Sequence, residues 1–366
     1  MRSKNKVLTG VALVLLLNIV ACNKSNKVQV RNVEKDKEEF SLENIKLPKI
    51  IVISDKDKSN ELYKLDNLSL NKIGDFKDVN LLDFHYDIEK KVYVALVNNV
   101  KDSGQKSSEV EIKTIDKNYT LKNSAVYCDI KISPDSKRIA FRSFKDKNLT
   151  EPEGLRVYDI NSQSEVKLNS KVLVSGSVYE WLDENNVIYY GIIPEEKNSN
   201  KIYKYNILTK EESVYFDKLN GYCLNALPIK SEGILLLENC DEDYKLSYYN
   251  EKTKEKNLIS ENLSQIGKAV LDENNNIVYF VGKNVSTDNF SLFSVNLCTF
   301  EISQLTYDLP KNVDINSGIA LDKNNNVLFC GKDSINNNDV YFYDVKNKST
   351  NLITEVTKEY KIFKDN

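Results

Sequence analysis

The chain has 366 residues, of which 51 are Lys or Arg, 54 are Asp or Glu and one is His. The net charge of −3 argues against nucleic acid as a partner, because nucleic-acid binding requires a basic surface. With a single histidine, His85, a Ser-His-Asp or Cys-His mechanism would have to run through that one residue.

The N-terminus has the pattern of an export signal. Arg2, Lys4 and Lys6 precede an apolar run over residues 7–20, which is too short to span a bilayer comfortably. The run ends in Ile19-Val-Ala-Cys22, which resembles the lipobox of bacterial lipoproteins. The resemblance implies cleavage before Cys22 and lipidation of its thiol. An ordinary signal peptide with a chance cysteine is the alternative.

Three regions follow from this pattern. Residues 1–21 are expected to be the signal peptide, and residues 22–46 the lipidated cysteine followed by a charged linker without a sustained apolar period. Residues 47–366 are expected to form the folded part. The protein is then secreted and lipid-anchored to the outer face of the cell membrane.

The folded part consists of short β-branched and aromatic runs separated by Asp, Asn, Ser and Gly, which is typical of an all-β protein. The runs recur in units of strand, tight turn, strand, loop, strand, turn, strand. The first turns of six units are marked by Asp87, Asp135, Asp183, Ser231, Asp272 and Asp322. Four antiparallel strands at this period predict the blades of a β-propeller. Seven blades fit best, and six or eight blades or a solenoid are the alternatives.

One unit carries a recognisable motif. Ser133-Pro-Asp-Ser-Lys137, followed by Arg138 and Ile139-Ala-Phe141, resembles the Ser-Pro-Asp-Gly-Lys-x-Ile-Ala-Phe motif of TolB-like (WD40-like) propeller repeats, with Ser136 in place of glycine. Proline and aspartate favour a tight turn here. The resemblance implies the fold over residues 49–354. It says little of function, because such propellers occur in the Tol system, in peptidases and in many lipoproteins.

The first unit lacks its innermost strand, whereas the segment over residues 359–363 is left over after the last unit. We therefore expect this C-terminal segment to complete the first blade and to hide two sheet edges. Residues 27–30 are the weaker candidate for the same place.

No residue pattern points to a catalytic, metal or cofactor site. His85 lies inside an apolar strand, where a structural role is the usual one. Asp272-Glu-Asn-Asn-Asn276 and Asp322-Lys-Asn-Asn-Asn326 resemble calcium loops, but residues 277 and 327 replace the glycine that an EF-hand needs, and a hairpin turn explains both runs. Carboxylates are plentiful, so an enzyme acting on carbohydrates remains the alternative.

Five cysteines remain besides Cys22. Cys128 and Cys330 lie in predicted strands and are expected to be buried. Cys223 and Cys240 lie on two strands joined by a turn. A pairing centred near residues 231 and 232 would set them opposite one another, so a disulfide between them is a hypothesis.

The middle loop of each unit predicts the working surface. These loops are longer than a chain reversal needs, and they lie over residues 54–60, 97–108, 142–154, 191–200, 239–243, 282–289 and 331–338. Polar and charged residues at or near them are the candidate binding residues: Asn98, Lys101, Arg142, Lys145, Glu195, Asp241, Asp243, Lys283 and Lys332. We expect a monomeric, non-catalytic binding or scaffolding module for a protein or glycan partner, with no cofactor.

Overall fold

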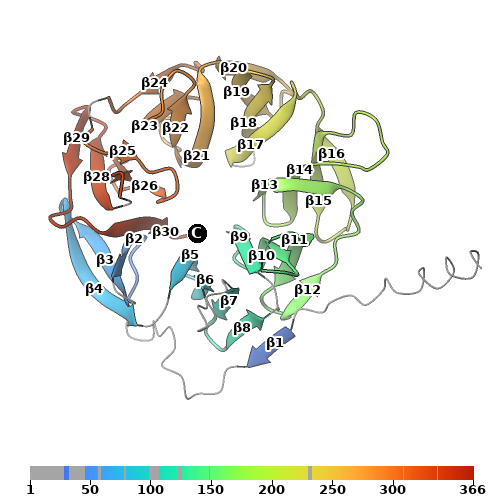
Figure 1. The fold of residues 1–366 in the computed structure, drawn as a ribbon, viewed down its shortest axis with the longest axis horizontal. Helices are drawn as coiled ribbons and strands as arrows, with labels where there is room; N and C mark the ends of the chain where they lie inside the picture. The colour runs from blue at the N-terminus through green and yellow to red at the C-terminus, as the bar shows by residue number, and fades with distance from the viewer. Residues whose placement is uncertain are drawn as a thin grey trace, which may run out of the picture.

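The computed structural model describes residues 29–32 and 46–366, apart from 57–58, 78–79, 99–106, 123–125, 148, 230–232, 308 and 336. The described residues form seven antiparallel sheets arranged in a ring (Figure 1). The fold is a seven-bladed β-propeller. No helix occurs among the described elements, so none there could span a bilayer.

The blades follow one another around the ring in chain order. The first blade contains β2 (Ile50–Lys56), β3 (Ser59–Asp66) and β4 (Ser69–Lys77). The second contains β5 (Leu81–Asp87), β6 (Val92–Asn98), β7 (Ser108–Lys113) and β8 (Asn118–Lys122). The third contains β9 (Val126–Ile132), β10 (Arg138–Phe144), β11 (Pro152–Asp159) and β12 (Ser164–Val166). The fourth contains β13 (Leu173–Trp181), β14 (Asn186–Ile192), β15 (Lys201–Asn206) and β16 (Glu212–Phe216).

The remaining three blades repeat this order, with the innermost strand first. The fifth contains β17 (Tyr222–Ile229), β18 (Gly233–Cys240), β19 (Asp243–Asn250) and β20 (Lys256–Ser260). The sixth contains β21 (Leu263–Asp272), β22 (Ile277–Asn284), β23 (Phe290–Asn296) and β24 (Ile302–Gln304). In the seventh, two short strands, β25 (Asn312–Val313) and β26 (Ile319–Leu321), both pair with β27 (Val327–Lys332), which is followed by β28 (Asn338–Asp344) and β29 (Ser349–Leu352).

Apolar packing lies between the blades. The described residues contain seven buried apolar clusters, and each joins two neighbouring blades. Val94 of β6 and Ile139 of β10, for example, belong to the cluster between the second and third blades. A single four-stranded sheet would leave both of its apolar faces in water, and stacking around the ring buries them.

An aspartate side chain holds the first turn of the second, third, fourth, sixth and seventh blades. Asp135 Oδ1 accepts a hydrogen bond from Lys137 N at 3.2 Å, and the Asp87, Asp183, Asp272 and Asp322 carboxylates accept from main-chain N–H groups two or three residues further on. These bonds satisfy amides that the hairpin leaves unpaired. The runs that begin at Asp272 and Asp322 are therefore hairpin turns, as their place in the repeat predicts.

The ring closes through the C-terminal segment, as expected. β30 (Glu359–Lys364) is the innermost strand of the first blade, and it pairs antiparallel with β2 from Ile50↔Lys364 to Asp55↔Glu359. The alternative candidate over residues 27–30 was wrong. The strand β1 (Gln29–Asn32) instead pairs with β8 at the outer edge of the second blade, where an unpaired strand edge is available.

Candidate functional site

Two adjoining cavities occupy the centre of the ring. The larger has a volume of about 460 Å³ and the smaller about 320 Å³. Both are lined mainly by the innermost strands of the blades, and His85, Lys131, Glu180, Leu227 and Lys268 line both. The larger cavity lies at the strand ends that lead into the first turns, whereas the smaller lies toward the strand beginnings. Together they form one central channel.

Side-chain alternation in these strands places charge in the channel. In β5, Asp83 and His85 line the channel, and the intervening Phe84 borders the larger cavity but is only 1% exposed. In β9, Asp129 and Lys131 line the channel and alternate with the buried Ile130 and Ile132. Successive residues of a strand point to opposite sides, so a strand that buries one set of apolar side chains against a neighbouring blade presents the other set to the channel.

Two ion pairs brace the wall of the channel. Lys131 pairs with Glu180 of the neighbouring blade. Burial alone would lower the pKa of Lys131, but the Glu180 carboxylate outweighs it and raises that pKa above its usual value. Arg142 Nε donates to Asp129 Oδ2 at 2.7 Å. Both carboxylates are therefore already engaged by a basic side chain.

Asp83 and His85 form a second charged group. His85 Nε2 lies 3.3 Å from Asp83 Oδ2, and Lys268 Nζ lies 3.9 Å from Asp83 Oδ1. Burial alone would raise the pKa of Asp83, but His85 and Lys268 outweigh it and hold that pKa far below its usual value. His85 Nε2 is buried and lacks a hydrogen bond of good geometry among the described residues.

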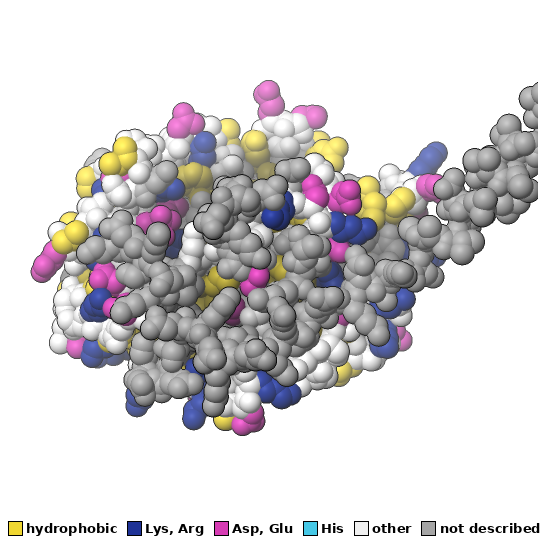
Figure 2. All heavy atoms as spheres, turned by 60° about the horizontal axis from the view of Figure 1, so that its bottom comes forward, with side chains coloured by type: hydrophobic (Ala, Val, Ile, Leu, Met, Phe, Trp, Pro, Cys, Tyr) yellow, Lys and Arg dark blue, Asp and Glu magenta, His cyan; other side chains and the backbone are white. Residues whose placement is uncertain are grey.

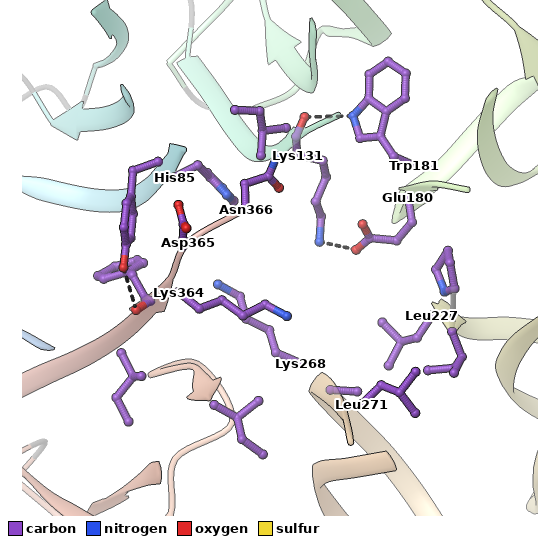
Figure 3. A pocket seen from close by; sticks show the side chains of 18 of the residues that line it. His85, Lys131, Glu180, Trp181, Leu227, Lys268, Leu271, Lys364, Asp365 and Asn366 are labelled. Atoms are coloured by element: carbon purple, nitrogen blue, oxygen red, sulfur yellow. Dashed lines mark hydrogen bonds and ion pairs between the residues drawn. The ribbon is translucent and has the colours of Figure 1, made fainter. Parts of the chain in front are cut away.

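Lys268, from β21 of the sixth blade, and Lys364, from the end of β30 of the first blade, both extend into the channel (Figure 3). Lys268 Nζ lies 6.0 Å from the centre of the Phe363 ring. The surroundings disfavour the charged form of Lys364 by removing solvent, and the nearby Lys268 adds like-charge repulsion, so the pKa of Lys364 is lowered. No carboxylate of the described residues forms an ion pair with Lys364.

The last two residues fix the strand that carries Lys364. Asp365 Oδ1 accepts a hydrogen bond from Ile88 N at 2.8 Å. Asn366 Nδ2 donates to Ser133 O at 2.9 Å and to Ser136 Oγ at 2.7 Å. These bonds reach the first turns of the second and third blades, so the end of β30 is anchored to the two blades that follow it around the ring.

The side of the channel formed by the fifth and sixth blades is apolar. Leu227, Pro228 and Leu271 line the larger cavity and are half-buried. In Figure 3, Leu227 and Leu271 lie on the opposite side of the cavity from His85 and Asp365. The channel thus has a charged side and an apolar side. Within the described residues no group of three or more His, Cys, Asp or Glu side chains could hold a metal ion.

The predicted middle-loop residues lie elsewhere. Those that the structure describes lie in or near the connection between the second and third strands of the second to seventh blades, and none of these lines either central cavity. Lys101 falls outside the described residues. Arg142 is inside β10 and engages Asp129, and Lys283 Nζ lies 3.3 Å from Asp288 Oδ1.

The connections that carry the other candidates are shorter than expected. The second strand of every blade, and the third strand of most blades, extends into the predicted middle loop. Only residues 241 and 242 separate β18 from β19, so Asp241 lies in a tight turn and Asp243 begins a strand. Asn98 and Lys332 end strands β6 and β27, whereas Lys145 and Glu195 lie in connections.

The structure does not pair Cys223 with Cys240. Both thiols are free, Cys223 is buried and Cys240 is exposed. Cys223 lies opposite Glu238, and the register shifts between Cys223 and Asn225. Next to the turn, Ile229 lies opposite Gly233, a register that would already set Asn239 opposite Cys223 if it held along the hairpin, and the shift moves the partner to Glu238. Cys240 therefore does not lie opposite Cys223. Cys330 is buried as predicted, and Cys128 is half-buried. Cys22 falls outside the described residues.

Comparison with known proteins finds likeness in fold. No protein-family model and no curated protein matches the sequence. Among solved structures, TolB from Acinetobacter baumannii is 12% identical over 88% of each chain, with a TM-score of 0.46. An oligogalacturonate lyase from Vibrio parahaemolyticus is 12% identical over 89% of this chain and 86% of its own, with a TM-score of 0.49.

A puromycin-hydrolyzing peptidase from Mycobacterium tuberculosis has a TM-score of 0.51 at 9% identity, over 85% of this chain and 53% of its own. Identities this low concern the fold alone. Since the similar structures include enzymes as well as TolB, the function has to be argued from this chain's own residues.

Proposed function

We propose that the chain is a secreted lipoprotein, anchored through Cys22 to the outer face of the cell membrane, whose propeller binds a ligand or partner at the central channel without chemically altering it. The proposal of lipid anchoring is supported by the lipobox-like sequence Ile19-Val-Ala-Cys22. The proposal of binding is supported by the cavity of about 460 Å³, which is within the range of small-molecule sites.

The observation that carries a binding function is the state of the charged groups in the channel. Glu180 is engaged by Lys131, and Asp129 by Arg142. Carboxylates held in ion pairs are fixed in position and already have a partner, which suits recognition better than proton transfer. The two lysines at the end of β30 and on β21 offer positive charge to an incoming group.

The outer surface supports a specific site rather than general electrostatic attraction. On the face shown in Figure 2, basic and acidic side chains are interspersed wherever described residues are visible. A mixed surface gives little long-range steering of a polyanion. Recognition is therefore expected to depend on the channel.

Catalysis is the second candidate, and the pair His85 and Asp83 favours it. A histidine beside a carboxylate in a cavity is an arrangement that a general base uses. Under this alternative, His85→Gln would abolish turnover of a substrate while leaving its binding largely intact.

Site-specific photo-crosslinking tests the location of binding. A photoreactive amino acid at Leu227, in the cavity wall, is expected to crosslink a specific ligand or partner in native membranes, identified by mass spectrometry. The same group at Glu195, on the middle-loop face, serves as the matched control. Crosslinking to a specific partner from Glu195 alone would place the working surface on the middle-loop face and overturn the channel proposal.

A further inference from the structure

We propose that Lys268 and Lys364 form a subsite for the carboxylate of a small amphiphilic ligand, whose apolar part packs against Leu227, Pro228 and Leu271. This inference rests on the proposed binding role of the channel and names the chemistry of what is bound. A free aliphatic acid and the C-terminus of a short apolar peptide both present this group, and the titration below distinguishes them.

Of the two lysines, only Lys268 has a carboxylate partner within the described part of the chain, and that contact with Asp83 is long, at 3.9 Å. Other nearby carboxylates have partners of their own: Glu180 pairs with Lys131, and Asp365 accepts from Ile88 N. Lys364 has no carboxylate partner among the described residues. An anion placed between the two ammonium groups would relieve their repulsion and accept a charge-assisted hydrogen bond from each.

The shape of the channel selects an amphiphilic anion over a simple one. The half-buried apolar side chains of the fifth and sixth blades line the same cavity as the lysines. Covering them with an aliphatic chain removes apolar surface from water, which inorganic phosphate or acetate cannot do. The volume of about 460 Å³ is sufficient for such a ligand.

The aromatic residues of the cavity argue against a sugar in this subsite. Trp181 is 6% exposed and Phe84 is 1% exposed, and the Trp181 indole Nε1 donates to Lys131 O at 3.0 Å. Their rings are therefore largely covered by protein, and little ring face remains for a sugar to stack on. The open apolar contacts are aliphatic, which favours an aliphatic ligand.

Isothermal titration with matched ligands tests the charge and the apolar part separately. The probes are hexanoate, its neutral counterpart hexanamide, acetate and inorganic phosphate, together with N-acetyl-Gly-Leu as the free acid and as the amide. We expect hexanoate or the free-acid peptide to bind at least about tenfold more tightly than its amide, and acetate and phosphate to bind more weakly than either. Preference for hexanoate over the peptide would identify a free acid, and the reverse a peptide C-terminus.

Lys364→Gln is the diagnostic variant, because it keeps the length of the chain and the backbone pairing with Ile50. It should weaken binding of the charged probe about tenfold and leave the melting temperature unchanged. Lys167→Gln, at an exposed lysine between the third and fourth blades, should have no effect. Equal binding of acid and amide, unaltered binding by Lys364→Gln in a folded protein, or no binding of any probe at millimolar concentration would overturn the subsite. Crosslinking from Leu227 would still support the binding role of the channel in those cases.

Discussion

The strand β30 should contribute a large part of the stability of the ring, and Ile362→Ala tests this. Ile362 is 3% exposed and belongs to the apolar cluster between the seventh and first blades, with Val52 and Leu328. Replacing a buried isoleucine by alanine costs about 2–5 kcal/mol, because apolar contacts are lost and a cavity remains.

That loss should be visible in thermal unfolding. A change of 1 kcal/mol shifts the melting temperature by ~2–4 °C in domains of 150–250 residues, and this propeller is larger. At the lower sensitivity, Ile362→Ala should lower the melting temperature by roughly 4–10 °C, measured by circular dichroism. Val356→Ala is the control, because Val356 lies just before β30 and is 59% exposed. It should change the free energy of unfolding by less than ~0.5 kcal/mol.

Deletion of residues 357–366 extends the same argument. It removes Tyr360, Ile362 and Phe363, which are 4%, 3% and 7% exposed, and burial of three such side chains is worth about 5–9 kcal/mol. Net stabilities of folded proteins are about 5–15 kcal/mol, so the truncated ring should melt far lower or lose its cooperative transition. An unchanged melting temperature in the deletion, or in Ile362→Ala, would refute the closure argument.

Three further predictions concern other parts of the chain. Cys22→Ala should release the protein from membranes or leave it unprocessed, as followed by fractionation and mass, and a wild-type protein found wholly in the medium would contradict lipidation. Gly318→Ala should lower the free energy of unfolding by about 1–3 kcal/mol and by more than Gly154→Ala. Both glycines have positive φ, of +86° and +82°, but only at Gly318 would the new Cβ approach a β30 carbonyl oxygen, at 2.1 Å. If chemical denaturation showed the same loss of unfolding free energy for Gly318→Ala and Gly154→Ala, the approach to the β30 carbonyl would have no role. Hydrogen bonding to Lys358, Tyr63 and Lys72 lowers the pKa of Glu61 from 4.5 to about 2, so the stability it contributes is present above pH ~4.5 and is lost as the pH falls toward 2. Glu61→Gln should make the free energy of unfolding less dependent on pH between about 4.5 and 2. The same pH dependence in the variant and the wild-type protein would contradict the interaction.

The blades could be predicted because their signals are local. The aspartate in the first turn bonds amides only two or three residues away, and each strand alternates or runs apolar within a few residues. The third turns use a similar device that the repeat analysis did not identify. Asn206, Asn250 and Asn296 accept from the amide two residues on, and the residue four positions later has positive φ, as at Lys210.

The binding residues could not be predicted because their proximity depends on the closed ring. Lys268 and Lys364 lie far apart in sequence and on different blades. Each belongs to an innermost strand whose charged residues look like ordinary surface positions. A detectable signal did exist in β9, where Asp129 and Lys131 alternate with apolar residues, since alternation in the first strand of a blade indicates that one side of it is polar and faces the channel.

The hypothesis about Cys223 and Cys240 shows how small differences in register defeat a symmetric pairing model. Ile229 lies opposite Gly233 beside the turn, so a regular ladder would already set Asn239, and not Cys240, opposite Cys223. The register of β17 and β18 changes between Cys223 and Asn225, and an irregularity of this kind leaves no trace that sequence alone would identify. Long-range residue pairs are therefore less predictable than the turn from which they are counted.

The strand β30 both closes the ring and carries a residue of the proposed ligand subsite. β30 completes the first blade, and its last residue, Lys364, brings positive charge to Lys268 of the sixth blade. The hydrogen bonds of Asp365 and Asn366 then tie the same segment to the second and third blades. Because the segment is bonded to these two blades at the channel, loosening β30 should disorder the charged side of the channel before the blades themselves separate. Ligand binding should therefore be lost at a lower temperature than β-sheet structure, and a carboxylate ligand should raise the melting temperature only when Lys364 is present.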